Sequence, residues 1–304
     1  MERPSCIKLF QFQGHRDCIY ALLAAGDGKT FFSAGGDGMI VRWSLDHPDQ
    51  GTQVAQLNGS IYSMALDPTG ELLVAGRNHD GLHAIDLRSG SSAGSVHTGG
   101  TAIFDIAFNK GSILTANGDG RLLRISPHRW SIDEVLPLSD KSLRCIALDP
   151  QTGSVAVGSS DHRIRILDAN TLTVGQEWQA HANSVFTLAY GIGDRILYSG
   201  ARDARINTWD MRIDPPAGKE TAGHLFAVNH IAFRGDGKHF LTCSMDKTIK
   251  VWTSGIEPKL QRVLDRARHA GHGNSVNRLC WINEEIFASA GDDRMISIWK
   301  FISA

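Results

Sequence analysis

The chain has few cysteines and no long apolar segment. Five cysteines are scattered among its 304 residues: Cys6, Cys18, Cys145, Cys243 and Cys280. An odd number without any C-x-x-C pair predicts no disulfide framework and no zinc site, and is typical of a reducing compartment. The N-terminus lacks the apolar core of a signal peptide, and no run approaches eighteen apolar residues. We therefore expect a cytoplasmic protein that is neither exported nor inserted into a membrane.

An excess of charge of one sign is also missing. Lys and Arg total 31 and Asp and Glu total 32, so the formal net charge is -1 at pH 7. Such a chain creates no global field toward nucleic acid or an anionic membrane, and we expect neither as a partner. Nucleic-acid binding stays a weaker alternative that would use Arg144, Arg202 and the basic residues of the stretch 259–269.

What the chain does contain is an internal repeat. Residues 181–210 hold three short apolar runs separated by turn residues, and each run is too short for a helix, which predicts three antiparallel strands. Copies of this stretch recur at steps of 39 to 47 residues, each with an aspartate in its second turn. Those seven aspartates are Asp37, Asp80, Asp119, Asp161, Asp203, Asp246 and Asp293. Repeats of this length indicate stacked units such as solenoids or propellers.

Three further positions recur around each aspartate. Six residues after it stands a large apolar residue, which is tryptophan in four copies: Trp43, Trp209, Trp252 and Trp299. A histidine precedes it by 21 or 22 residues in five copies: His15, His97, His181, His224 and His272. A hydroxyl residue precedes it by four residues in the same five: Ser33, Thr115, Ser199, Thr242 and Ser289. Units two and four instead have Asn58 and Ser139 at the histidine position, which leaves their hydrogen-bond network open.

With Gly14-His15, Gly223-His224, Gly271-His272 and Trp209-Asp210, the chain resembles WD-repeat (WD40) proteins over essentially all of its length. The resemblance implies an all-β fold: a single seven-bladed β-propeller domain over residues 1–304, with four antiparallel strands per blade. One strand is spare at the N-terminus and one is missing at the end of unit seven. We therefore expect the N-terminal strand to complete the last blade and close the ring.

The repeated Ser/Thr, His and Asp sets also invite comparison with a hydrolase triad. A nucleophile needs one activated site with an oxyanion hole, whereas five sets at similar spacing favour a structural role. The resemblance implies that the histidine, hydroxyl, aspartate and tryptophan bond one another inside a blade. The residues predicted for this structural network are His15, Ser33, Asp37 and Trp43; His181, Ser199, Asp203 and Trp209; His224, Thr242, Asp246 and Trp252; and His272, Ser289, Asp293 and Trp299. We expect no catalytic residue, no cofactor and no metal, although His269 and His272 have metal-like spacing.

The first strand of each unit carries a second signal. Its apolar residues stand at positions one, four and six, as in Ile19, Leu22 and Ala24, whereas a strict period of two would require one, three and five. The extra residue predicts a β-bulge that turns the second side chain toward one face of the ring. In proteins that this chain resembles, that position and the residue before the marker aspartate lie on the top face and often contact partners. The candidate partner-binding residues are Tyr20, Tyr62, His79, Phe104, Arg144, Phe186, Arg202, Asn229, Met245, Asn277 and Asp292.

Large aromatics and arginines are the residues that interface hot spots favour. The sequence therefore favours a non-enzymatic scaffold that is monomeric by itself and binds a protein or peptide at its top face. The alternative is an enzyme, or a propeller that holds a small ligand or metal at the channel mouth, but only His79 and Asp292 of the set could serve such a site. The stretch 259–269 is predicted as an outer strand and loop, with a short helix as the alternative.

Overall fold

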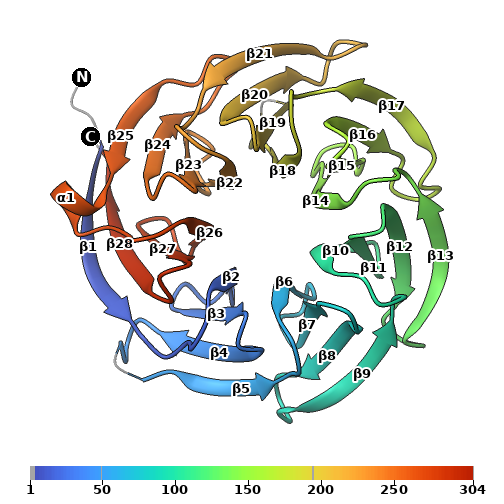
Figure 1. Ribbon diagram of the computed structural model, residues 1–304, viewed down its shortest axis with the longest axis horizontal. Coiled ribbons are helices and arrows are strands. Elements are labelled where there is room, and N and C mark those ends of the chain that lie inside the picture. Colours follow the sequence, from blue (N-terminus) through green and yellow to red (C-terminus); the bar gives the residue numbers. More distant parts are fainter. Residues whose placement is uncertain (1–3, 49, 194, 304) are drawn as a thin grey trace.

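The computed structural model describes residues 4–48, 50–193 and 195–303, and these form seven four-stranded antiparallel sheets. The sheets are arranged as blades in a closed ring (Figure 1). In blades one to six the strands follow chain order from the centre of the ring to its rim. The seven-bladed fold that the repeat predicts is confirmed.

Blades one to four use consecutive strands. Blade one contains β2 (Ile19–Ala24), β3 (Thr30–Gly35), β4 (Met39–Ser44) and β5 (Thr52–Gln56). Blade two contains β6 (Ile61–Leu66), β7 (Leu72–Arg77), β8 (Gly81–Asp86) and β9 (Ser91–His97). Blade three contains β10 (Ile103–Asn109), β11 (Ser112–Asn117), β12 (Arg121–Ser126) and β13 (Ser131–Pro137). Blade four contains β14 (Leu143–Leu148), β15 (Val155–Ser159), β16 (Arg163–Leu167) and β17 (Val174–Gln179).

The last three blades include the one seam in the ring. Blade five contains β18 (Val185–Tyr190), β19 (Ile196–Ala201), β20 (Arg205–Asp210) and β21 (Ala217–Ala222). Blade six contains β22 (Val228–Phe233), β23 (His239–Ser244), β24 (Ile249–Thr253) and β25 (Leu260–Leu264), followed by the one-turn helix α1 (Arg266–His269). Blade seven contains β26 (Val276–Trp281), β27 (Ile286–Gly291) and β28 (Ile296–Ile302), with β1 (Ser5–Phe12) as its outer strand.

The N-terminal strand closes the ring, as predicted. β1 pairs antiparallel with β28, so that Cys6 lies opposite Phe301 and Phe12 opposite Ile296. The Phe12 ring is buried, and its centroid lies 5.2 Å from that of Trp43 in blade one. β1 therefore completes blade seven and also packs against blade one, which ties the first strand of the chain to the last.

A bulge interrupts the innermost strand of every blade. The register of the inner pair shifts between the first and third residues in all seven, as between Ile19 and Ala21 in β2 and between Val276 and Arg278 in β26. The predicted bulge is confirmed, and the second residue of each inner strand is the one that the register skips. A bulge re-aims the side chain at this point, which separates it from the alternation of the sheet.

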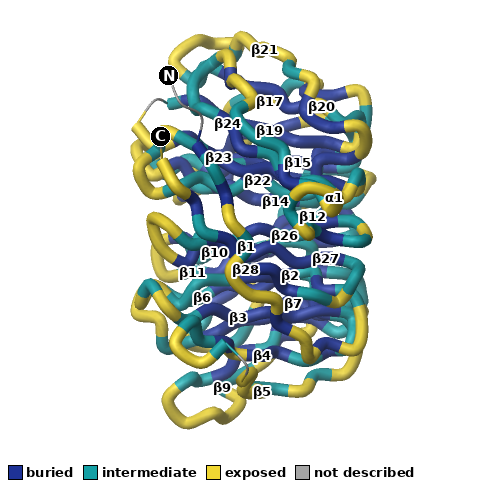
Figure 2. Tube along the Cα trace, turned by 90° about the vertical axis from the view of Figure 1, so that its left-hand side faces the viewer, coloured by how far each residue is buried: buried dark blue, intermediate teal, exposed yellow. Residues whose placement is uncertain are grey.

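The core lies between neighbouring blades. One apolar cluster joins Val185 of β18 to Leu197 and Trp209 of the same blade and to β14 to β16 of blade four. Figure 2 shows the middle strands buried and the loops and outer strands exposed. The basic stretch 259–269 contains both predicted alternatives, since the outer strand β25 is followed by α1. No helix in the described part of the chain has the length and apolar character that crossing a bilayer requires.

Candidate functional site

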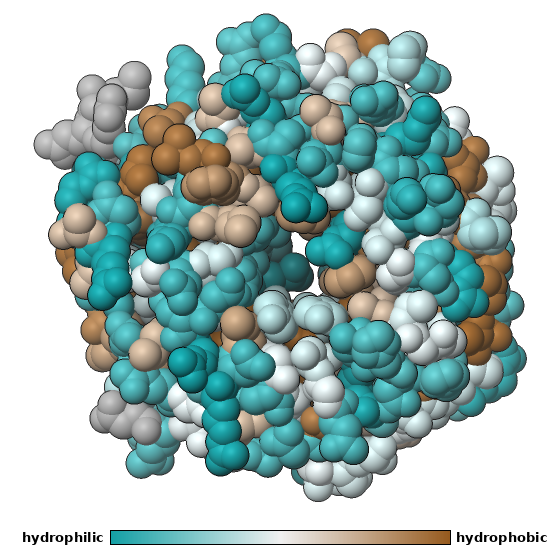
Figure 3. All heavy atoms as spheres, viewed as in Figure 1, coloured by the Kyte–Doolittle hydropathy of each residue, from teal (hydrophilic) through white to brown (hydrophobic). Residues whose placement is uncertain are grey.

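The seven bulge residues converge at the centre of the ring. Together with Arg278 they line one cavity of about 240 Å³: Tyr20, Tyr62, Phe104, Arg144, Phe186, Asn229 and Asn277. The space-filling view shows the ring open at its centre (Figure 3). We call this cavity the mouth, and the face on which it opens the top face. The structure thus brings together seven of the eleven candidate partner-binding residues, one from each blade.

Five of these side chains form a continuous arc over blades one to five. The rings of Tyr20 and Tyr62 lie 5.0 Å apart between centroids, and those of Tyr62 and Phe104 lie 5.6 Å apart. The guanidinium carbon of Arg144 lies 3.8 Å from the Phe104 centroid and 4.9 Å from that of Phe186. Ring pairs and cation–π contacts at these distances stabilise one another. Each of the five is only half-buried, so the arc stays accessible from the mouth.

The mouth is positively charged at Arg144. Burial lowers the pKa of its guanidinium, and the charge of Arg202 lowers it further, although the group stays protonated because an arginine titrates far above neutral pH. The exposed Arg202 lies in the turn before Asp203. Two cations therefore act on the same side of the mouth.

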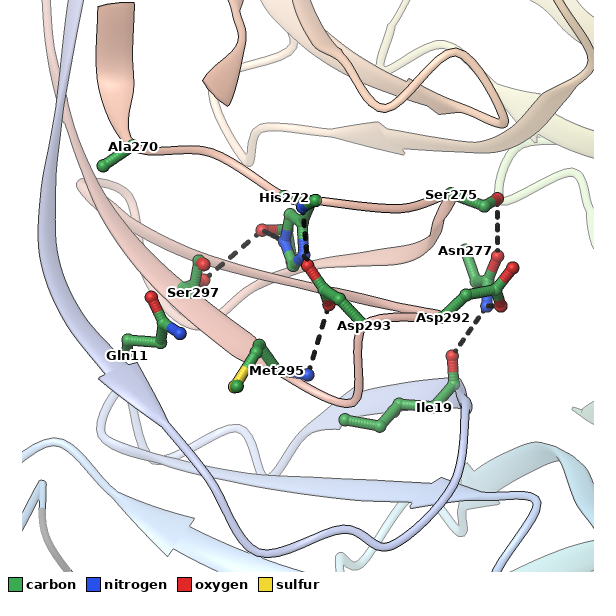
Figure 4. Close-up of polar contacts among 12 residues, drawn as sticks. Gln11, Ile19, Ala270, His272, Ser275, Asn277, Asp292, Asp293, Met295 and Ser297 are labelled. Atoms are coloured by element: carbon green, nitrogen blue, oxygen red, sulfur yellow. Dashed lines mark hydrogen bonds and ion pairs between the residues drawn. The ribbon is translucent and has the colours of Figure 1, made fainter. Parts of the chain in front are cut away.

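The remaining two bulge residues link blades. Asn229 donates to the backbone oxygen of Val276 at 2.8 Å, which ties blade six to blade seven. Asn277 donates to the backbone oxygen of Ile19 at 3.1 Å and to Asp292 Oδ1 at 2.7 Å, as Figure 4 shows. These contacts hold the two asparagine side chains in the wall of the mouth.

The other candidate residues lie in turns around the mouth. His79 is exposed, and its Nδ1 lies 3.0 Å from the backbone oxygen of Gly100. Met245 is 58% exposed, and sequence reasoning missed its neighbours Leu225 and Phe226, which are 83% and 59% exposed. Ser244 donates to the backbone oxygen of Phe226 at 3.2 Å, which holds the two loops together. Figure 3 shows apolar side chains gathered over blade six.

Below the mouth, the third residues of the inner strands of blades three to seven line a deeper cavity of about 500 Å³. This cavity includes Asp105, Cys145, Thr187, His230 and Arg278, and Arg278 also lines the mouth, so its side chain lies between the two spaces. Sequence reasoning missed these five third-position residues, which we call the belt. The signal was available, because the bulge that re-aims position two also fixes the direction of position three.

The belt bonds one blade to the next. Asp105 Oδ2 accepts from the amide of Ile146 at 2.9 Å, and Thr187 Oγ1 accepts from the amide of Ile231 at 3.1 Å. Burial raises the pKa of the Asp105 carboxyl against the opposing effect of Arg278, whose nearest nitrogen lies 3.9 Å away. Burial also raises the pKa of the Cys145 thiol, which makes this cysteine a poor nucleophile.

The described part of the chain does not bring metal-ligating side chains together. Among the described residues, no three His, Cys, Asp or Glu side chains are close enough together to hold an ion. His269 lies 3.8 Å from Asp265, whereas His272 is turned into its own blade.

The repeated polar residues form a hydrogen-bonded tetrad in four blades. In blade five, His181 Nδ1 donates to Asp203 at 3.0 Å, and its Nε2 lies 2.8 Å from Ser199 Oγ. Trp209 Nε1 donates to the same Ser199 hydroxyl at 2.9 Å. The matching tetrads of blades one, six and seven are His15, Ser33, Asp37 and Trp43; His224, Thr242, Asp246 and Trp252; and His272, Ser289, Asp293 and Trp299. Figure 4 includes the contact between His272 and Asp293.

The folded chain shifts the pKa of two tetrad residues. Burial lowers the pKa of His224, against the opposing effect of Asp246. Burial acts to raise the pKa of the Asp203 carboxyl, but the hydrogen bond and charge of His181 outweigh it and the pKa lies below its usual value. Both shifts come from contacts that exist only in the folded chain, so they link stability to pH.

His97 shares the spacing of the tetrad histidines from the marker aspartate but does not contact that aspartate, Asp119. Its side chain is 68% exposed and its Nδ1 bonds the backbone oxygen of Asp80 at 2.8 Å, while Asp119 accepts from Arg121. The tetrad histidines stand four residues before the inner strand, as His181 does before Val185, whereas His97 stands six residues before Ile103. Counting back from the inner strand of each unit, instead of from the marker aspartate, would have excluded His97 from the tetrad positions.

Blades two, three and four use an arginine where the others use histidine. Arg77 pairs with Asp80 and donates to the backbone oxygen of Asn58 at 2.8 Å. Arg121 donates to Asp119 at 2.6 Å and to the backbone oxygen of Thr98 at 3.0 Å.

In blade four, Arg165 donates to Asp161 at 2.7 Å, and Ser139 donates to the same carboxylate oxygen at 2.8 Å. Burial acts to raise the pKa of Asp161, but the hydrogen bonds from Arg165, Ser159 and Ser139 lower it to about 2. In all three blades the marker aspartate keeps a cationic partner, although the histidine is missing.

Comparison with known proteins agrees with this architecture. The family model for the WD domain, G-beta repeat, matches residues 6–44, 172–210, 218–253 and 262–300. Similar proteins include actin-interacting protein 1 of Caenorhabditis elegans, 23% identical over 94% of this chain and 47% of that protein. Telomerase protein component 1 of Mus musculus is 24% identical over 96% of this chain and 11% of that protein. The chain thus spans half or less of the length of these relatives.

A solved structure shares the fold over nearly the whole chain. The WD40 beta propeller domain of Doa1 superposes with a TM-score of 0.83 at 20% identity, and the match covers 98% of this chain and 97% of that one. The four matched segments span half of the chain and fall on blades that contain complete tetrads. The chain therefore belongs to the WD40 family of β-propeller proteins.

Proposed function

We propose that this protein is a non-enzymatic scaffold that binds a protein or peptide partner at the mouth of its ring. WD40 propellers generally bind protein partners, and the fold is generally not catalytic. The observation that carries the proposal is the arc of Tyr20, Tyr62, Phe104, Arg144 and Phe186, in which side chains from five consecutive blades touch at one opening.

The size of the mouth supports a peptide more than a cofactor. Its volume of about 240 Å³ is below the range of roughly 300 to 1,000 Å³ that small-molecule sites occupy. A single side chain of a partner fits such a space, while the rest of the partner lies over the top face. Half-buried rings fixed by their neighbours lose little conformational freedom on binding, which is a property of hot-spot residues.

The relatives support the class of activity and not the choice of partner. Actin-interacting protein 1 is named for an interaction with actin, but 23% identity does not transfer that partner to this chain. We propose a single-domain scaffold that is monomeric by itself and resides in the cytoplasm. The five cysteines support that location because each is a free thiol.

The test compares partner capture by three versions of the full chain. Affinity purification from the source cell with mass spectrometry identifies proteins held by the wild type and lost by Tyr62→Ala. The purified partner is then titrated against the wild type, Tyr62→Ala and the control Phe10→Ala, which removes a 40% exposed ring at the outer rim. We expect Tyr62→Ala to weaken binding by about 2 kcal/mol, or about 30-fold, and Phe10→Ala to leave it unchanged.

Thermal unfolding of each variant separates lost binding from lost folding. If every captured partner binds Tyr62→Ala as tightly as the wild type, the mouth is not the interaction surface.

A further inference from the structure

Arg144 is a half-buried cation that has no counter-ion among the described residues. Its guanidinium lies over the rings of Phe104 and Phe186, yet among the residues that the structure describes none accepts a hydrogen bond from it. A guanidinium has five N–H donors, and a cation that is partly removed from water without an acceptor raises the free energy of the folded chain. In contrast, Arg121 and Arg165 each bond a carboxylate in their blades. Within the described part of the chain, Arg144 thus has hydrogen-bond donors that the fold itself does not use.

The contacts of Arg144 leave its hydrogen-bonding edge free. A guanidinium that stacks on aromatic rings keeps its N–H groups in its own plane, where they point past the rings. Arg144 lines the mouth, so this edge is reachable from the top face. The stacking also fixes the side chain before anything binds, which lowers the entropy lost when a partner is ordered against it.

Two more cations reinforce the field at this point. Arg278 lies at the base of the mouth, and its Nε is buried without a hydrogen-bond partner among the described residues. Arg202 is close enough for its charge to act on Arg144. The carboxyl of Asp105 accepts from the amides of Ile106 and Ile146 and lies 3.9 Å from Arg278, so it offsets one of these three positive charges and leaves an excess. A low-dielectric recess with an excess of one charge concentrates ligands of the opposite charge.

We propose that the mouth binds a carboxylate of its peptide partner, with Arg144 as the principal contact and Arg278 beneath it. This inference rests on the proposed function, because it names the chemistry of the partner at the same surface. The carboxylate belongs to an aspartate, a glutamate or a chain terminus, and an adjacent apolar side chain lies against Tyr20 and Tyr62. A planar carboxylate can continue the plane of the stacked guanidinium and bond it twice. A guanidinium can also bond a phosphate twice, so the experiment distinguishes the two anions.

The experiment uses a random dodecapeptide display library selected on the full-length wild type. Each selected peptide is then synthesised in three forms: with its acidic residue, with the matching amide, and with phosphoserine at that position. Affinities are measured by fluorescence polarisation against the wild type, Arg144→Met, Arg144→Lys and Tyr62→Ala. The matched control is Arg129→Met, which removes an arginine that pairs with Asp133 on the outer part of blade three.

The expected result is enrichment of Asp or Glu at one position. Replacing that residue by its amide should weaken binding to the wild type about tenfold or more, and should change little on Arg144→Met, because the contact is already lost. Arg144→Lys should recover only part of the affinity, since an ammonium cannot form the paired contact. Arg129→Met should bind like the wild type.

Other outcomes separate the two ideas. Peptides that need Tyr62 but contain no acidic residue, or that bind equally well as amides, overturn the carboxylate site and leave the scaffold in place. Tighter binding of the phosphoserine form overturns the carboxylate in favour of phosphate. Peptides that ignore both Tyr62 and Arg144, or a library without any binder, overturn the proposed function and this inference with it.

Discussion

Asp203 is the most demanding test of the structural tetrads, because three N–H groups depend on one carboxylate. Its oxygens accept from His181 Nδ1 at 3.0 Å, from the amide of Ala182 at 2.9 Å and from the amide of Arg205 at 3.0 Å. Asp203→Ala removes all three acceptors at once. The side chain of His181 is 0% exposed, so its freed N–H finds no water, whereas Ala182 and Arg205 are exposed.

The magnitude follows from these exposures. A buried unpaired donor costs about 1 to 3 kcal/mol, and an amide that water reaches costs less than about 1 kcal/mol. The total for Asp203→Ala is then about 3 kcal/mol. For a chain of 304 residues, an unfolding entropy of about 2.1 cal/mol/K per residue converts this into a fall in Tm of about 5 °C. Asp203→Asn keeps one acceptor oxygen and should cost about half as much.

The assay is equilibrium urea unfolding followed by tryptophan fluorescence, with Tm from a thermal scan as a second measure. Trp209 shares the Ser199 hydroxyl with His181 and so reports on the same tetrad. The control is Asp140→Ala, whose carboxylate is 85% exposed and should cost no more than about 0.5 kcal/mol. An Asp203→Ala protein within about 0.5 kcal/mol of the wild type would refute the reasoning that the tetrad holds the blade.

Two further predictions concern pH and ring closure. The folded pKa of His224 lies below its ordinary value of 6.5, so the unfolded chain binds more protons and stability should fall as the pH drops below about 6.5. The pKa of Asp161 falls from 3.8 to about 2 on folding. Its contribution to the free energy of unfolding, about 1 to 2 kcal/mol after solvent screening, is present above pH 3.8 and lost as the pH falls through 2. Urea midpoints measured between pH 8 and pH 2 test the predictions for His224 and for Asp161. Phe12→Ala should destabilise the chain by about 3 to 4 kcal/mol because it empties the contact of β1 with blade one, whereas Phe10→Ala on the same strand should change the urea midpoint little; equal effects of the two would contradict the closure argument.

The sequence could predict the propeller because the pattern of each strand and turn occurs in several copies of the repeat. The bulge in the inner strands follows from apolar residues such as Ile19 and Leu22 that are three apart instead of two, and the mouth follows from the bulge. The closing strand follows from counting strands at the two ends. These are local patterns that do not depend on which side chain meets which across the ring.

The arginine contacts and the contacts across the ring could not be predicted, because they join positions that have no fixed spacing in the sequence. Arg77 precedes its aspartate by three residues, Arg121 follows by two and Arg165 follows by four, so no column of the repeat reveals them. The contact between Asp105 and Arg278 spans blades three and seven, and only closure of the ring brings the two together. That no described residue pairs with Arg144 is likewise a property of its surroundings and not of its own position.

The two kinds of polar network divide the ring into unequal arcs. Blades five, six, seven and one are contiguous around the circle and use imidazoles, while blades two to four use guanidiniums. The seam between β1 and β28 lies inside the imidazole arc. Burial lowers the pKa of His224, so mild acid should first weaken blade six, which lies next to the blade that contains this seam.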